Sequence, residues 1–167
     1  MKKNIFIENI NGNITSRPPV WFMRQAGRIL PSYLKLKQTY SFDEMMQNKE
    51  LAAKVTLLPL DDLGVDAGIL FSDILVIPKA LGFKLEFTAK GPKFHNALDE
   101  NINIENLKFN PQKLDYIYNN IREIKFQRPE TPLIGFCGGP LTTFLFMFRR
   151  NELNKDFNNV IKLFYKE

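Results

Sequence analysis

The chain has 167 residues, of which 44% are hydrophobic and 25% charged, and this suits one globular unit with a core of its own. The net charge of +5 favours acidic partners but does not separate nucleic acid from a polycarboxylate. Because no nucleic-acid-binding motif is recognisable and no apolar run nears the ~20 residues of a membrane span, we expect neither nucleic acid nor a membrane as partner.

The N-terminus and the cysteine content predict a cytoplasmic protein. Residues 1–19 are polar and rich in asparagine, and they predict a loose lead-in with a turn at Asn11-Gly12-Asn13. This segment lacks the apolar stretch of a secretory signal. The single cysteine, Cys137, excludes an internal disulfide framework and is interpreted as a small buried hydrophobe.

A short strand and two helices are predicted next along the chain. The apolar run from Val20 to Met23 predicts a short buried strand. Pro31 suits the first position of a helix that continues to residue 37. Ser41 and Glu44 have the spacing of a capping box and predict the start of a second helix.

A third helix and a second strand follow. The helix is predicted to be disturbed near Pro59 and to end at Gly64. Its apolar face holds Leu51, Ala52, Val55 and Leu58. The apolar run that begins at Val65 predicts a strand, which Pro78 and Gly82 end.

The second half of the chain predicts a hairpin arm, a loop, a helix and a third strand. Lys84–Thr88 alternates like a hairpin arm, whereas Ala89–Phe109 predicts a loop with little regular structure. Asn110-Pro111 predicts a helix start. The apolar stripe of that helix comprises Leu114, Ile117, Tyr118, Ile121 and Ile124. Leu133–Phe136 predicts a buried strand.

Two further helices are predicted over Leu141–Phe148 and Phe157–Phe164. Apolar strands separated by helices are typical of a parallel sheet covered by helices, so the fold class is α/β.

Two arginines mark the first candidate site. Arg24 and Arg28 bracket the segment Gln25-Ala26-Gly27, which has little bulk. Guanidinium forks match carboxylate or phosphate oxygens, and a glycine lets a ligand approach the backbone, so the segment predicts an anion clamp. The alternative is two solvated arginines in a surface loop.

Asp73 is the second candidate. On the predicted strand Ile69, Phe71 and Asp73 share one face, and a buried carboxylate needs donors. The alternative is an aspartate that caps the next segment through backbone N–H groups.

Three segments resemble, in the same order, the landmarks of the uroporphyrinogen decarboxylase family. They are Met23–Arg28 followed by Leu30-Pro31, Asp66–Leu75 with Pro78–Gly82, and Ile134–Pro140 followed by Thr142. The resemblance covers the chain from about Pro18 to Met147 and implies a (β/α)8 TIM barrel. Such a barrel needs about 250 residues, so the chain is interpreted as one incomplete domain, the first half of a barrel with three to four strands.

The resemblance implies a carboxy-lyase that converts the acetate arms of uroporphyrinogen III to the methyl groups of coproporphyrinogen III, in porphyrin and haem biosynthesis, without metal or cofactor. Arg24 and Arg28 would bind substrate carboxylates, and Arg24 would help to protonate the pyrrole. Asp73 would accept the pyrrole N–H groups. Gln25, Ala26 and Gly27 would provide backbone and positioning contacts to the substrate, Ile69 and Phe71 would wall the ring, and Phe146 stands where the family has a tyrosine.

The resemblance also implies a homodimer and leaves two alternatives open. In the first alternative, the chain is a catalytically inactive truncated or split half-barrel that needs a complementary C-terminal half. In the second, it is a relative of the corrinoid methyltransferases, which would use zinc. Asp61 and Asp62 stand where the family commonly has a basic pair. The family's cavity serine and late histidine belong to the other half.

Overall fold

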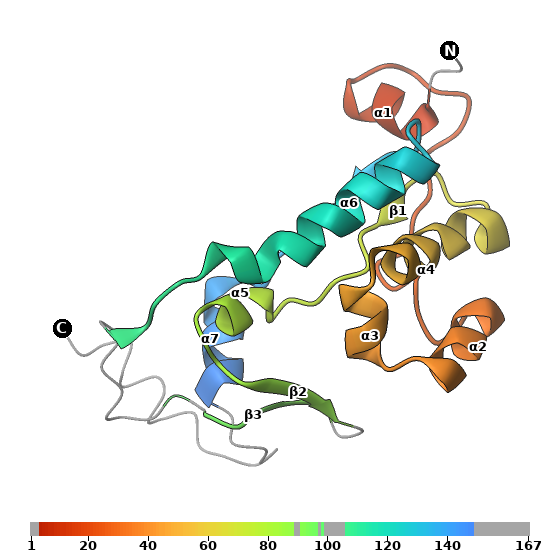
Figure 1. Cartoon of the computed structure of the whole chain (residues 1–167). Coiled ribbons are helices and arrows are strands. Elements are labelled where there is room, and N and C mark those ends of the chain that lie inside the picture. Colours follow the sequence, from red (N-terminus) through yellow and green to blue (C-terminus); the bar gives the residue numbers. More distant parts are fainter. Residues whose placement is uncertain (1–3, 89–90, 97, 99–105, 149–167) are drawn as a thin grey trace. The chain divides into compact units, whose positions relative to one another are not determined.

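The computed structural model describes residues 4–88, 91–96, 98 and 106–148 (Figure 1). The chain divides into two compact units. Unit 1 comprises Met1–Ser72 and Asp115–Phe136, and unit 2 comprises Asp73–Leu114 and Cys137–Glu167. Each unit is described below by itself.

Unit 1 consists of helices around one short parallel strand pair. Its elements are α1 (Ile5–Ile10), α2 (Pro31–Thr39), α3 (Phe42–Gln47), α4 (Lys49–Leu63), β1 (Gly68–Ile69), α6 (Asp115–Gln127) and β4 (Leu133–Ile134). In the β1–β4 pair, Gly68 lies opposite Leu133 and Ile69 opposite Ile134. The parallel pairing that the sequence predicts is confirmed for these two strands.

The helix ends of unit 1 confirm the local signals. Pro31 is at the start of α2. Ser41 and Glu44 form a reciprocal capping box at α3. Gly64 ends α4 in the left-handed conformation that glycine adopts without steric cost. The predicted disturbance at Pro59 is wrong: α4 continues through it, since the buried face of the helix packs against the core and one missing N–H is tolerated there.

The core of unit 1 lies where α4 and α6 pack against each other and against β1. Its fully buried cluster comprises Ala53, Leu57, Leu70 and Ile124. Ile117 and Ile121 pack against this cluster as the stripe predicts, but Tyr118 is 52% exposed. Asn120 takes a buried position instead, and its amide donates to the Met46 carbonyl at 2.7 Å.

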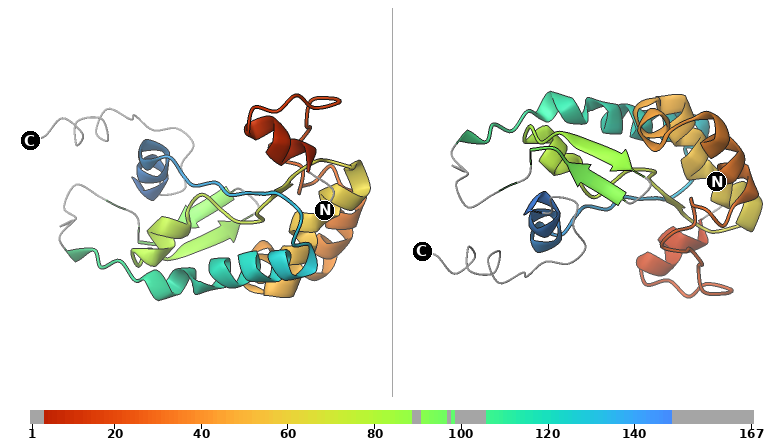
Figure 2. Two further views of the ribbon diagram at one scale, coloured as in Figure 1. Left: turned by 90° about the horizontal axis from the view of Figure 1, so that it is seen from above. Right: turned by 90° about the horizontal axis from the view of Figure 1, so that it is seen from below.

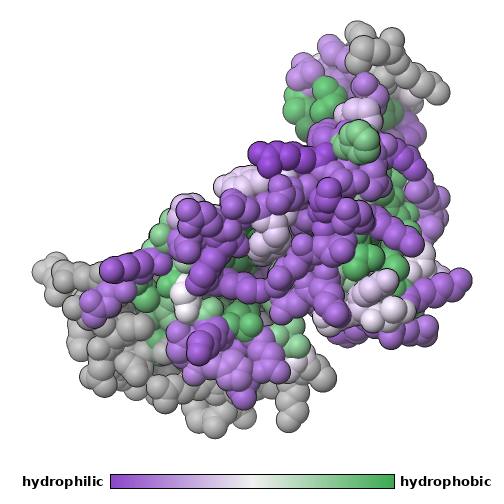
Figure 3. Space-filling model, viewed as in Figure 1, coloured by the Kyte–Doolittle hydropathy of each residue, from purple (hydrophilic) through white to green (hydrophobic). Residues whose placement is uncertain are grey.

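Within the predicted lead-in, Ile5–Ile10 form the short helix α1. The Asn4 side chain accepts from the Phe6 N–H and caps α1. No residue of α1 is buried, and Ile7 and Ile10 are exposed. The hydropathy surface in Figure 3 accordingly shows an apolar patch over α1, whereas the visible surface of α6 is mostly hydrophilic.

The strand predicted at Val20–Met23 is wrong, because this segment is irregular and exposed. Trp21 is 41% and Met23 81% exposed. The Val20 N–H and carbonyl both bond to Asp66, and the Phe22 N–H donates to the Gln25 side chain. Apolar content alone does not make a strand, since a strand also needs a neighbour with which to exchange backbone hydrogen bonds.

The other two predicted strands are shorter than expected. β1 ends at Ile69, and beyond it the Phe71 N–H bonds to the Thr56 hydroxyl at 2.9 Å and not to another strand. Asp73 is therefore not on a strand. β4 likewise ends at Ile134, and Phe136, predicted buried, is exposed.

Unit 2 is built from a hairpin and short helices. Its elements are α5 (Val76–Ala80), β2 (Leu85–Thr88), β3 (Gly91–Phe94), the 3-10 helix η2 (Pro111–Leu114) and α7 (Pro140–Phe148). Figure 2 shows β2 and β3 side by side, and they pair antiparallel. The core comprises Leu75, Phe83, Phe94, Leu98 and Met147.

The predictions for unit 2 are partly confirmed. The hairpin arm near Lys84–Thr88 exists, but Gly91–Phe94, placed in a loop by its glycine and proline, is its partner strand. Asn110 caps the next helix by accepting the Gln112 N–H, although the first turn is 3-10. Helix α7 matches Leu141–Phe148, whereas the helix predicted at Phe157–Phe164 lies outside the described residues.

Candidate functional site

Residues Met23–Leu30, called here the arginine loop, fold around a buried glutamine. Gln25 is fully buried, its Nε2 donates to the Ala67 carbonyl at 2.8 Å, and its Oε1 accepts the Phe22 N–H at 3.0 Å. The Gln25 N–H donates to the Phe22 carbonyl, and the Gly27 N–H to the Gln25 carbonyl. Both polar ends of this side chain are therefore used within the protein.

Arg24 and Arg28 both lie exposed on this loop. Within the described part of the chain, no carboxylate bonds to either guanidinium. Burial raises the pKa of Tyr33, and the charge of Arg28 lowers it in part. Two cations without acid partners on one tightly turned loop leave their donors available to an anion.

Gly27 is required by a close approach within the loop. A Cβ at this position would lie 3.0 Å from the Arg24 carbonyl oxygen, closer than nearly all real Cβ contacts. The glycine therefore allows the turn that carries the chain from Arg24 to Arg28. The sequence interpretation, that the glycine admits a ligand, is not needed to explain it.

A charged pair that sequence reasoning missed fixes the chain before the loop. The Arg17 guanidinium donates to both oxygens of Asp66, each at 2.7 Å, and the Val20 N–H donates to Asp66 Oδ2 at 2.7 Å. The hydrogen bond from Arg17 holds the pKa of Asp66 below its usual range, assisted by the Val20 N–H and by the charge of Arg17. No local signal announces this pair, because its members are 49 residues apart.

The two apolar candidates of unit 1 differ in their exposure. Phe71 is buried, and its ring makes edge contacts with Phe42 and Tyr33 at centroid distances of 5.2 and 6.2 Å. Ile69 is half-buried on β1. Phe71 is thus a core residue of unit 1.

Asp73 and Phe146 belong to unit 2. Asp73 Oδ1 accepts the Leu75 N–H at 2.7 Å, the capping contact that the sequence analysis set against a ligand role. Phe146 is half-buried against the unit 2 core. Since Arg24 and Asp73 lie in different units, a hollow shared by them stays a prediction.

The comparisons with known proteins identify the family. The model of the family "Uroporphyrinogen decarboxylase (URO-D)" matches residues 1–167, the whole chain. The chain belongs to the uroporphyrinogen decarboxylase family. A uroporphyrinogen decarboxylase of Legionella pneumophila is 40% identical over all of this chain, and one of Helicobacter pylori is 42% identical over 98% of it. One of Protochlamydia amoebophila is 44% identical over 91%.

The chain spans about half the length of these curated relatives, 49% in the Legionella and Helicobacter proteins. A solved structure, a methyltransferase from Methanosarcina mazei, superposes with a TM-score of 0.64 at 21% identity. The match covers 84% of this chain and 43% of that chain, and it shows likeness of fold alone. The described residues form the mixed α/β structure of this family, and their four short strands do not make a closed barrel.

Asp61 and Asp62, which by the resemblance stand where the family commonly has a basic pair, both have partners. Asp61 accepts from the Arg128 guanidinium at 2.7 Å, and Asp62 bonds to the Ser32 hydroxyl. The two carboxylates point to different neighbours, as expected for adjacent helical residues. The reversed charge is thus neutralised or hydrogen-bonded within unit 1.

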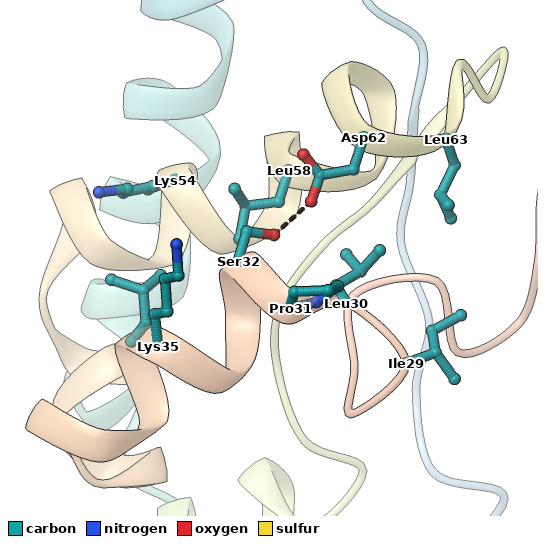
Figure 4. A pocket seen from close by; sticks show the side chains of 10 residues that line it. Ile29, Leu30, Pro31, Ser32, Lys35, Lys54, Leu58, Asp62 and Leu63 are labelled. Atoms are coloured by element: carbon teal, nitrogen blue, oxygen red, sulfur yellow. Dashed lines mark hydrogen bonds between the residues drawn. The ribbon is translucent and has the colours of Figure 1, made fainter.

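Asp62 also lines an open groove between α2 and α4, with a volume of about 630 Å³ (Figure 4). Figure 4 shows Ser32 and Asp62 joined across it. Its lining is largely apolar, with Lys35 and Lys54 as the cationic members.

Cys137, predicted buried, is exposed and free, since β4 ends three residues before it. His95 is exposed, and its Nε2 lies 2.8 Å from Oε2 of Glu86. In the described ranges, no three side chains of histidine, cysteine, aspartate or glutamate cluster as metal ligands would. None of the helices described is both long and apolar enough to span a bilayer.

Proposed function

We propose that this chain forms the arginine-bearing part of a uroporphyrinogen decarboxylase and acts on uroporphyrinogen III in porphyrin biosynthesis. The observation that carries the proposal is the arginine loop. It presents Arg24 and Arg28 exposed, without acid partners among the described residues, in a chain whose whole length matches the family.

Arg24 and Arg28 would bind the acetate and propionate carboxylates of the substrate. A guanidinium offers two parallel N–H donors to one carboxylate, and it keeps its charge at every physiological pH. Ala26 and Gly27 lie between the two arginines and would contact the substrate through their backbone. Gln25 contributes indirectly, because its side-chain polar atoms are already bonded.

The reaction removes one carboxyl group at a time. A proton added to the pyrrole carbon beside the acetate-bearing carbon makes the ring an electron acceptor, and the bond to the carboxylate breaks with release of carbon dioxide. The bonding electrons enter the ring, the exocyclic carbon takes a proton to become methyl, and the ring loses the proton added first. As the resemblance implies, Arg24 would help to deliver the proton to the pyrrole.

Four other residues would complete the site. Asp73 would accept the pyrrole N–H groups, with its Oδ1 shared with the Leu75 N–H at the start of α5. Ile69 and Phe71 would support the ring from below. Phe146 would contribute an apolar surface where the family has a tyrosine hydroxyl.

A second proposal follows from the exposed apolar residues of unit 1. We propose that this half of a (β/α)8 barrel needs a complementary segment, either further along a longer chain or on a second polypeptide. Trp21, Phe22 and Met23 are exposed, and β4 pairs only with β1 among the described strands. Parallel strands with open edges and exposed apolar neighbours are typical of surfaces that another element covers.

The proposed function is tested by binding and turnover. Uroporphyrin III, the stable oxidised form of the substrate, is titrated into the chain while the fluorescence of Trp21, the single tryptophan, is followed. Removing one charge-assisted fork costs roughly tenfold in affinity, so Arg24→Ala and Arg28→Ala should each weaken binding by that factor. Arg122→Ala is the matched control, because Arg122 is an exposed arginine of unit 1 bonded only to Asn119.

Turnover of uroporphyrinogen is then measured with the chain alone and with the C-terminal half of the Legionella relative added. Conversion to coproporphyrinogen in either mixture, lost in Arg24→Ala, supports the proposal. Equal porphyrin affinity in the wild type and in both loop variants would sink it. A cooperative, compact monomer with full activity alone would refute the need for a complementary segment.

A further inference from the structure

We propose that the dipeptide Asp66-Ala67, at the start of β1, is a dock that fixes the arginine loop, with Gln25 as the positioning residue for Arg24 and Arg28. The inference rests on the proposed function in one respect only, that the loop binds the anionic substrate. The docking itself is a property of unit 1.

The first anchor is Asp66. Its backbone N–H donates to the Val20 carbonyl at 2.8 Å, and its Oδ2 accepts the Val20 N–H at 2.7 Å. Arg17 then binds both carboxylate oxygens, and this holds the carboxylate in the orientation that reaches Val20. One residue of the dock therefore takes both backbone groups of one residue before the loop.

The second anchor is the carbonyl of Ala67. The N–H groups of Gly68 and Leu70 donate to Pro132 and Ile134 on the β4 side. In an extended chain the intervening residues face the opposite edge, so the Ala67 carbonyl lies where another strand would pair. Gln25 Nε2 takes that place, and since both residues are fully buried, no water replaces it.

The two anchors hold the segment 20–25 at both ends, Val20 on Asp66 and Gln25 on Ala67. This segment leads into the arginine loop. Gln25 Oε1 returns to the Phe22 N–H and closes the segment on itself. The turn then continues through the Gly27 N–H to Gln25 and the Leu30 N–H to Gly27. The backbone that carries Arg24 and Arg28 is therefore positioned by the Gln25 side chain, which does not itself need to contact a ligand.

Trp21 is a built-in reporter of this docking. It lies between the two anchors, is the single tryptophan, and is 41% exposed. Three variants break the dock in different ways: Gln25→Met removes both amide bonds at nearly constant volume, Asp66→Asn keeps an acceptor for Val20 but loses the ion pair, and Arg17→Gln acts from the surface. Asp61→Asn is the matched control, since Asp61 also bonds to an arginine at 2.7 Å in unit 1.

We expect acrylamide quenching of Trp21 to rise about twofold in Gln25→Met, close to the limit that its present exposure allows. Asp66→Asn and Arg17→Gln should give a smaller rise, and Arg17→Lys should restore most of the wild-type value. Far-UV circular dichroism checks that the helices remain in each variant. If Gln25→Met does not fold, the quenching measured in Arg17→Gln decides whether the dock exists. Quenching that is unchanged in Arg17→Gln, or raised as much in Asp61→Asn, would overturn the dock.

Uroporphyrin III titration separates positioning from contact. Arg24→Ala should weaken porphyrin binding while acrylamide quenching of Trp21 stays unchanged. Gln25→Met should weaken porphyrin binding by roughly the same tenfold and also raise the quenching of Trp21. Wild-type affinity in a Gln25→Met chain with a freed Trp21 would refute the positioning role. Absence of porphyrin binding by the wild type would refute the proposed function, while the quenching series would still decide whether the dock exists.

Discussion

The hydrogen bond between Thr56 and Phe71 offers the sharpest test of how unit 1 holds the chain beyond β1. The Thr56 hydroxyl, fully buried on α4, accepts the Phe71 N–H at 2.9 Å. Thr56→Val keeps the shape of the side chain and removes the acceptor, so a buried N–H loses its partner. Thr56→Ser keeps the acceptor and removes one methyl group.

The magnitudes follow from these two losses. Leaving a buried N–H without an acceptor costs about 1–3 kcal/mol in the free energy of unfolding. Removing one buried methyl costs about 1 kcal/mol, namely ~0.8 kcal/mol of transfer energy and a small contribution from the cavity. We therefore expect Thr56→Val to destabilise unit 1 at least as much as Thr56→Ser, although valine is the more apolar residue.

Urea unfolding, followed by Trp21 fluorescence and by far-UV circular dichroism, measures both variants against the wild type. The slope of the free energy against urea concentration should stay constant, so that a shift in midpoint reports stability alone. Thr56→Val as stable as the wild type, with Thr56→Ser less stable, would show that the hydroxyl does not serve Phe71 and that the reasoning is wrong.

The remaining predictions concern charge and close packing. Because the folded-state pKa of Asp66 is depressed chiefly by the Arg17 hydrogen bond, its contribution to stability is present above the unfolded pKa of about 4 and is lost as the pH falls through the lower folded value. Urea midpoints of the wild type and Asp66→Asn should thus differ at pH 6 and converge in acid; a constant difference would contradict this. Gly138→Ala should destabilise unit 2, because the added Cβ would lie 2.5 Å from the Ile74 carbonyl oxygen and also meet Thr143, and thermal unfolding measures the loss. Unchanged stability would mean that the backbone at Ile74 moves freely.

Much of the local structure could be predicted because its causes are local. The capping box of Ser41 and Glu44, the proline at the start of α2 and the glycine after α4 each act within a few residues. The family landmarks around Arg24, Asp73 and Gly138 were readable for a similar reason, since each is a short run of residues whose order the sequence states directly. The exposure of both arginines without acid partners among the described residues is compatible with the predicted clamp and equally with two solvated arginines in a surface loop.

The sequence also misled where a pattern is shared by two environments. Val20–Met23 has the apolar content of a buried strand but is exposed, and Gly91–Phe94 has the glycine and proline of a loop but pairs with β2. The sequence assigned Gln25 a backbone and positioning role but did not indicate that its side chain would bond to the Ala67 carbonyl. Composition does not tell which backbone groups will find a partner, and that decides each case.

The sequence by itself determined the family, the helix caps and the residues available to bind an anion. Only the tertiary structure decided where the strands stop, which polar side chains are buried, and how the arginine loop is held. The physical reason is separation along the chain: the Gln25–Ala67 and Arg17–Asp66 bonds join residues 42 and 49 positions apart. Such contacts depend on the packing of α4, α6 and the β1–β4 pair, which brings distant backbone groups to hydrogen-bonding distance.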